Sequence, residues 1–272
     1  MANHTARCEP IVRAFDAVDA DDTVLPLRVE GRTVRAMADF GEPLAVAALS
    51  LARRLADGAT LWCIAPEWPE HARHVAVEFV HPVLVGKRAF PAVSLDSNDP
   101  ATALRSLVRA GDVVLAISPG DSLPTAAVMR RAQAWGAMTV WMGAGSRPAI
   151  RTADHIVWID GDTGEVADDV ASPAAYDGRL VLPYHVLWEL THVCFEHPGL
   201  LEVRADADSD DDVCITCSDE GRIGEVITAD RDGRARVRTA AGIETIDTTI
   251  VPTVVPGDLV LIHAGAAISE VP

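Results

Sequence analysis

The chain has 272 residues, about two domains' worth, and 49% of them are hydrophobic, so it can bury a substantial core. Its 40 acidic and 23 basic residues give a net charge of -17, which repels nucleic acid and argues against a nucleic-acid-binding groove. No apolar run reaches the ~18 residues of a membrane-spanning helix, and the first residues lack a secretory pattern. We therefore expect a cytoplasmic protein with no membrane contact.

The first clear element follows residues 1–32, which mix charges, turn formers and short apolar groups and are open to interpretation as an appendage or an oligomer contact. Pro43 suits the first turn of a helix, and Gly58 suits its end. Between them, apolar side chains recur at helical spacing, at Leu44, Ala48, Leu51 and Leu55. A helix is predicted here.

Apolar runs then alternate with helical patterns as far as residue 195. Strands are predicted at Thr60–Ala65, Ala89–Leu95, Asp112–Ser118, Met138–Met142 and His155–Ile159. Helices are predicted at Pro69–Phe79, Pro100–Ala110, Ser122–Trp135 and Leu182–Phe195. This order indicates an α/β domain over residues 1–201, in which helices cover both faces of a parallel sheet. Ligands of such sheets bind beyond the carboxyl ends of the strands.

Two of the predicted helices carry stripes of histidine and glutamate. His71, His74, Glu78 and His81 share one face of the first, and His185, Glu189, His192 and Glu196 share one face of the second. Two such stripes of imidazole and carboxylate groups are suited to bind a metal ion such as zinc. Two solvated polar faces explain the same pattern equally well.

The loop from Ser118 to Ser122 joins the third predicted strand to a helix. Ser118 and Ser122 are candidate phosphate-binding residues, because free amides and the helix dipole attract an anion at a helix N-terminus. Asp121 in the same loop would repel that anion. A plain helix cap by Ser122 is the competing interpretation.

Residues 40–199 carry several short motifs in a recognisable order. They are His74-Val75-Ala76-Val77-Glu78, Phe90-Pro91-Ala92-Val93-Ser94-Leu95 leading to Asn98-Asp99, Gly111-Asp112-Val113-Val114-Leu115-Ala116-Ile117-Ser118, Ala153-Asp154, and a last helix that bears histidine. In this order they resemble the sugar isomerase (SIS) domains, and among those the sedoheptulose 7-phosphate isomerases.

The resemblance implies a zinc or other divalent metal bound by His74, Glu78 and His192, with Glu78 also moving a proton. A glutamine ligand of that family aligns near Tyr184 or His185. It also implies a sugar phosphate ligand and a homo-oligomer. Both phosphate-binding turns depart from the family, because Ala65–Pro69 has no glycine and Ser118–Ser122 contains a carboxylate.

The last sixty residues predict a second, all-β domain. A charged or small-residue stretch, 202–212, reads as a solvated linker. The domain at 213–272 has predicted strands at Arg222–Ile227, Arg234–Thr239, Glu244–Ile250 and Leu259–His263, joined by turns such as Asp232-Gly233. Four or five strands this short favour a small, OB-like closed barrel, because closure removes exposed edges.

Cys214, the strand Arg222-Ile223-Gly224-Glu225-Val226 and the ending Gly257-Asp258-Leu259-Val260-Leu261-Ile262-His263-Ala264-Gly265 resemble the HypC/HupF chaperones of nickel-iron hydrogenase assembly. The resemblance implies that Cys214 and His263 transiently hold an iron precursor, together with hydrogenase maturation proteins and the hydrogenase large subunit. Here the cysteine is internal, whereas in that family it follows the initiator methionine. Cys214-Ile215-Thr216-Cys217 is half of a four-cysteine zinc site, but the other cysteines are scattered along the chain, and a redox pair would need a strand-to-helix context that is absent here. The remaining alternative is two small residues at a strand start.

The leading hypothesis is therefore a hydrogenase maturation chaperone, with the SIS-like domain as a scaffold or ligand-binding domain and no catalytic activity of its own. One alternative is a metal-dependent phosphosugar isomerase in which Glu78 is the general base. Another is a regulatory protein that senses a sugar phosphate.

Overall fold

The computed structural model describes residues 33–159, 174–202, 221–230, 232–251 and 253–271. Its first part alternates helices and strands: α2 (Thr33–Ala56), β1 (Leu61–Ile64), α3 (Pro69–Val80), β2 (Ala92–Ser94), α4 (Pro100–Leu107), β3 (Val113–Ile117), α5 (Leu123–Ala134), β4 (Met138–Ala144), β5 (His155–Ile159) and α6 (Ala174–Glu196). The five strands form one parallel sheet in the order β2-β1-β3-β4-β5. The predicted parallel sheet is confirmed.

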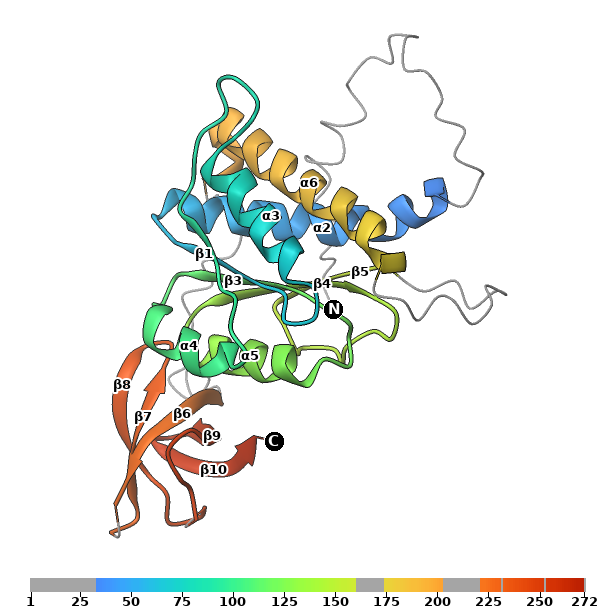
Figure 1. Ribbon diagram of the computed structural model, residues 1–272. Coiled ribbons are helices and arrows are strands. Elements are labelled where there is room, and N and C mark those ends of the chain that lie inside the picture. The colour runs from blue at the N-terminus through green and yellow to red at the C-terminus, as the bar shows by residue number, and fades with distance from the viewer. Residues whose placement is uncertain (1–32, 160–173, 203–220, 231, 252, 272) are drawn as a thin grey trace, which may run out of the picture.

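Helices cover both faces of this sheet (Figure 1). Because side chains alternate along a strand, Leu115 of β3 packs into the core under α2, α3 and α6, while Val114 and Ala116 pack against α4 and α5. The central strands β3 and β4 are buried along their whole length. The sheet therefore separates two apolar cores, with different helices above and below it.

Two helices begin earlier than predicted. α2 starts at Thr33 and carries Pro43 inside it, and α6 starts at Ala174 and carries Pro183 inside it. A proline has no N–H and crowds the preceding turn, so the sequence alone marked a start near each. The two helices pack along each other over the sheet, and this tertiary contact keeps both continuous through their prolines.

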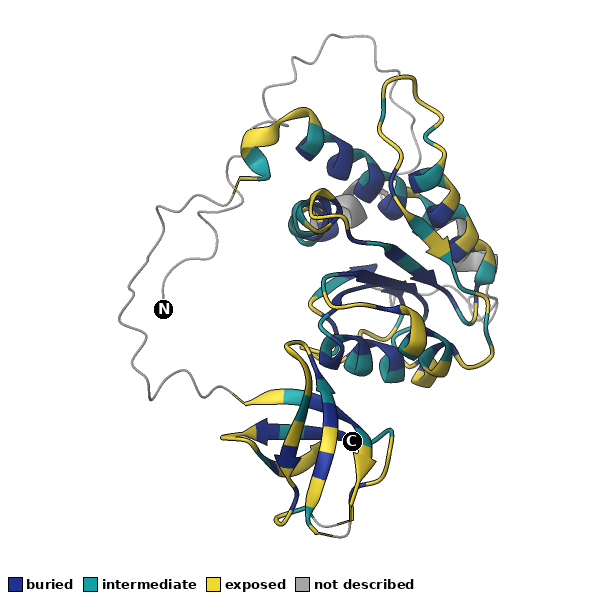
Figure 2. Ribbon diagram, turned by 90° about the vertical axis from the view of Figure 1, so that its left-hand side faces the viewer, coloured by how far each residue is buried: buried dark blue, intermediate teal, exposed yellow. Residues whose placement is uncertain are grey.

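The second part of the chain is a closed five-stranded barrel, as predicted. Its strands are β6 (Arg222–Ala229), β7 (Arg234–Thr239), β8 (Gly242–Asp247), β9 (Leu259–His263) and β10 (Ala266–Val271), in the order β10-β8-β7-β6-β9. Along β7 buried and exposed residues alternate, which Figure 2 shows, and the arginines point outward as the sequence pattern indicated. Strand β10 was not among the predicted strands, and its parallel pairing with β8 closes the barrel.

The barrel docks on α4 and α5, below the sheet in Figure 1. Glu225 of β6 is only 2% exposed, and its carboxylate accepts a hydrogen bond from Trp135 Nε1 at 2.7 Å. Arg105 Nε lies 3.3 Å from the same carboxylate. In return, Arg238 of β7 donates to the carbonyls of Arg105 and Val108 at the end of α4, at 2.7 and 2.6 Å. A cation at the C-terminus of a helix interacts favourably with the helix dipole and the last carbonyls. Together, these contacts join the barrel to the α/β domain.

Several sequence predictions fall outside the described residues. They concern most of the 202–212 linker, the pair Cys214 and Cys217, and residues 1–32. The domain boundaries therefore stay predictions. Within the ranges given above, no helix has the length and apolar character to cross a membrane.

Replacing Glu225 by glutamine tests the barrel contact. The change keeps the shape and leaves an acceptor for Trp135, but Arg105 and Arg131 lose their counter-charge. We expect a loss of about 1–3 kcal/mol in the free energy of unfolding, measured by urea denaturation.

Glu244→Gln is the matched control, because its carboxylate pairs with Arg222 at the barrel surface. That pair should contribute less than about 1 kcal/mol. Equal losses for the two variants would contradict a stabilising role of the buried carboxylate.

Candidate functional site

α3 presents the first two residues of the candidate site. Pro69 occupies its first turn, where a missing N–H costs nothing, and Glu70 complements the helix dipole. Its apolar face packs on the sheet, through Ala72, Val75, Ala76 and Phe79. His74 and Glu78, one turn apart, lie beside that buried face and remain partly exposed.

α6 supplies the third residue. His185 Nε2 lies 3.6 Å from Glu78 Oε1, and His74 Nε2 lies 3.4 Å from the same oxygen. All three ligand atoms lie within 4.8 Å of one another. The side chains of His74, His185 and Glu78 are 41, 38 and 16% exposed, so the cluster is open on one side.

The two imidazoles are oriented so that each Nε2 faces Glu78. His185 Nδ1 lies 2.7 Å from the carbonyl of Val181, which can only accept, so this nitrogen carries the proton. In the neutral ring, Nε2 then has a free lone pair. His74 Nδ1 lies 3.0 Å from the hydroxyl of Tyr184. In metal sites, a ligating histidine typically donates its other ring N–H to such a partner, and this hydrogen bond fixes the tautomer and the orientation of the ring.

This donor set fits a divalent metal ion of the zinc type. Ligands ~2.1 Å from a tetrahedral zinc lie about 3.4 Å apart, which matches the separations from Glu78 Oε1. Two imidazole nitrogens and one carboxylate oxygen are ligands that zinc accepts, and three protein ligands leave one position for water or substrate.

His192 is not brought into this cluster. It is 2% exposed, with Nδ1 2.8 Å from the carbonyl of Trp188 and Nε2 3.0 Å from that of Arg88. The other stripe members Glu189 and Glu196 both bind Lys87, at 3.0 and 2.9 Å. Of the four polar residues predicted to share a face of α6, only His185 reaches the α3 ligands.

The loop predicted to bind phosphate is filled by the chain's own groups. Ser118 is fully buried, and its hydroxyl accepts from Trp141 Nε1 at 2.9 Å. The Ser122 hydroxyl caps α5 by accepting from Thr125 N at 3.3 Å, and it donates to Glu67 Oε1 at 2.6 Å. The helix cap interpretation of Ser122 therefore agrees with the geometry, and the carboxylate that meets it is Glu67.

The thiols of Cys63 and Cys194 and the barrel histidine His263 are not part of this cluster. Burial raises the pKa of the Cys63 and Cys194 thiols, which disfavours the thiolate form that binds metals. His263 ends β9 and is exposed, followed by a turn in which Ala264 and Gly265 have φ of 50° and 77°. Because Cys214 falls outside the described residues, the joint role of Cys214 and His263 stays a prediction.

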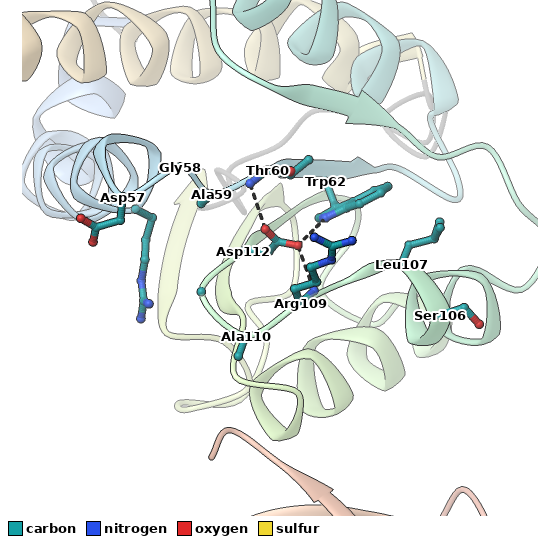
Figure 3. Close-up of a pocket in the computed structure, with 12 residues that line it drawn as sticks. Asp57, Gly58, Ala59, Thr60, Trp62, Ser106, Leu107, Arg109, Ala110 and Asp112 are labelled. Carbon is teal, nitrogen blue, oxygen red and sulfur yellow. Dashed lines mark hydrogen bonds between the residues drawn. The ribbon is translucent and has the colours of Figure 1, made fainter. Parts of the chain in front are cut away.

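A cavity of about 570 Å³ lies at the amino ends of strands β1 and β3 (Figure 3). Asp112 lines this cavity, and its carboxylate accepts from Thr60 N at 2.9 Å, Trp62 Nε1 at 3.1 Å and Arg109 N at 2.9 Å. Three donors satisfy this carboxylate and tie the ends of the two strands together. Asp112 therefore acts as a structural residue.

Neither a protein-family model nor a curated protein sequence matches the chain. Similar solved structures include a phosphoheptose isomerase from Francisella tularensis, with 15% identity and a TM-score of 0.49 over 68% of this chain and 97% of that one. A phosphoheptose isomerase from Neisseria gonorrhoeae has 16% identity and a TM-score of 0.46, over 67% and 97%.

Metal titration tests the cluster. For the metal-free full chain, we expect Zn²⁺ binding by calorimetry. His185→Ala should weaken it more than ~100-fold, since losing even a residue that only supports a metal ligand costs ~10–100-fold. His192→Ala should keep the affinity while lowering stability by about 1–3 kcal/mol, because it removes a buried ring that packs against Phe90 and Trp188. The reverse pattern would show that His192 is the ligand.

Phosphate binding tests the contact between Glu67 and Ser122. The wild-type chain should bind inorganic phosphate weakly. The Ser122 hydroxyl already donates to the Glu67 carboxylate, whose negative charge repels a phosphate ion. Glu67→Gln should increase the affinity on the order of tenfold, measured by ³¹P NMR titration. Asp121→Gln, which changes an exposed carboxylate of the same loop, is the control. No gain in Glu67→Gln over this control would contradict the role given to Glu67.

Proposed function

We propose that the α/β domain is an SIS domain that binds a divalent metal ion between α3 and α6 and acts on a sugar with neighbouring hydroxyl and carbonyl groups. The observation that carries this proposal is the cluster of His74, Glu78 and His185, in which three ligand atoms converge and one side remains open. The motif around His74 and Glu78, which resembles the sugar isomerases, supports the choice of substrate class.

Each residue of the cluster has a distinct role in this proposal. His74 and His185 would hold the ion through Nε2, and Glu78 through Oε1. A bound divalent ion supplies Lewis-acid polarisation of a carbonyl oxygen. Glu78 would also carry a proton between adjacent carbons, through its second carboxylate oxygen, because it is the carboxylate of the cluster. The contact of Glu67 with Ser122 favours a sugar whose recognition does not depend on phosphate at that loop.

Solvent deuterium exchange tests this activity. The zinc-loaded full chain is incubated in D₂O with ketoses and ketose phosphates, and ¹H NMR follows exchange of the protons next to the carbonyl. Glu78→Gln should slow exchange by about 10²–10⁴-fold, the usual contribution of a general base.

Glu189→Gln is the matched control, because this carboxylate on α6 binds Lys87 outside the cluster. It should leave the exchange rate unchanged. Metal binding without any exchange would restrict the domain to a binding or sensing role.

We propose hydrogenase assembly as a second function, carried by the barrel. The closed five-stranded barrel and the exposed His263 at the end of β9 favour it, together with the HypC/HupF resemblance. In this proposal Cys214 and His263 hold an iron precursor transiently, since thiolate and imidazole both suit iron. The partners would be hydrogenase maturation proteins and the hydrogenase large subunit, with the α/β domain as an oligomeric scaffold.

Complementation in cells tests the second function. Cys214→Ala and His263→Ala should each abolish nickel-iron hydrogenase maturation in a strain that depends on this chain, with Cys217→Ala as the comparison thiol. Normal hydrogenase activity in the Cys214 and His263 variants would exclude this role of the barrel.

A further inference from the structure

Tyr184 stands immediately before His185 on α6 and is only 2% exposed. Its hydroxyl lies 3.0 Å from His74 Nδ1 and 3.4 Å from Nδ1 of the buried His71, one turn earlier on α3. Both imidazoles meet the phenol ring edge-on, with ring centroids 5.3 and 5.7 Å away. A hydroxyl of α6 is thus packed between two histidines of α3.

The hydrogen bonds of this chain of groups allow two arrangements of the protons. A hydroxyl has a single proton, so it donates to at most one of the two rings, and a hydrogen bond with the other ring requires that ring to donate. If His74 is the donor, its proton sits on Nδ1 and a lone pair remains on Nε2. The Tyr184 hydroxyl then donates to His71 Nδ1. In the opposite direction, a neutral His74 carries its proton on Nε2, toward Glu78 Oε1, and cannot bind a metal ion there.

His185, the candidate ligand that α6 supplies, does not need such a partner. His185 Nδ1 meets the carbonyl of Val181, four residues earlier in its own helix, so local geometry fixes its tautomer. His74 Nδ1 instead reaches across to α6, and its orientation depends on the packing of two helices. Tyr184 is therefore the group that links this packing to the direction of the His74 lone pair.

We propose that Tyr184 is a positioning residue of the metal cluster, whose hydroxyl takes the Nδ1 proton of His74 and holds Nε2 toward Glu78 and His185. This inference rests on the proposed metal-binding function. The hydroxyl is the only group that Tyr184→Phe removes, and the buried ring is kept.

The test measures Zn²⁺ and Co²⁺ affinity of the full chain by chelator competition. Tyr184→Phe should bind each ion ~10–100-fold more weakly than the wild type, as expected for the loss of a hydrogen-bond partner of a ligating histidine. It should also change the Co²⁺ absorption spectrum, which reports on ligand geometry. Thr191→Val is the matched control, because it removes a buried hydroxyl that donates to the Leu187 carbonyl within α6.

Unchanged affinity and spectrum in a folded Tyr184→Phe would overturn the inference, while the metal-binding proposal would stand. If the wild-type chain binds neither ion, the metal-binding proposal itself fails. A measurement on the wild type covers the case in which the variant does not fold. In ¹⁵N–¹H spectra of the zinc-loaded chain, His74 should carry its proton on Nδ1, and a proton on Nε2 would overturn the inference.

Discussion

The packing of α6 against α3 is the contact on which the candidate site depends. The two helices come from parts of the chain more than 100 residues apart, and Trp188 Nε1 of α6 donates to the carbonyl of Glu78 at 2.9 Å. Buried residues such as Leu187 and Phe79 join both helices to the core above the sheet. Burial of apolar area supplies the stability, so the polar cluster can stay partly open and available for chemistry.

The sheet separates this cluster from the barrel (Figure 1). The cluster lies among the helices on one face, and the barrel is joined to α4 and α5 on the other through Glu225 and Arg238. The barrel therefore leaves the open side of the candidate cluster uncovered. His263 belongs to the barrel and the candidate cluster to the α/β domain, so the two proposed functions can be tested separately.

The sequence could not predict which of the two histidines His185 and His192 lies beside α3. His185 and His192 lie seven residues apart on one stripe of α6, so helical spacing cannot say which of them meets α3. In the fold, the ring of His192 packs against Phe90 and bonds to the Arg88 carbonyl, in the segment that leads into β2. The choice depended on a loop whose course no periodic pattern describes.

The sequence alone determined the order of strands and helices, the parallel sheet, the barrel and the pairing of His74 with Glu78, because these depend on local periodicity and on neighbours within one helical turn. Only the tertiary structure decided that His185 completes the cluster, that Tyr184 stands behind His74, and that Glu67 meets Ser122. These contacts join residues 55 to about 110 positions apart, and their geometry is set by how helices pack on the sheet. Side chains that distant in the chain meet only once the apolar cores have formed.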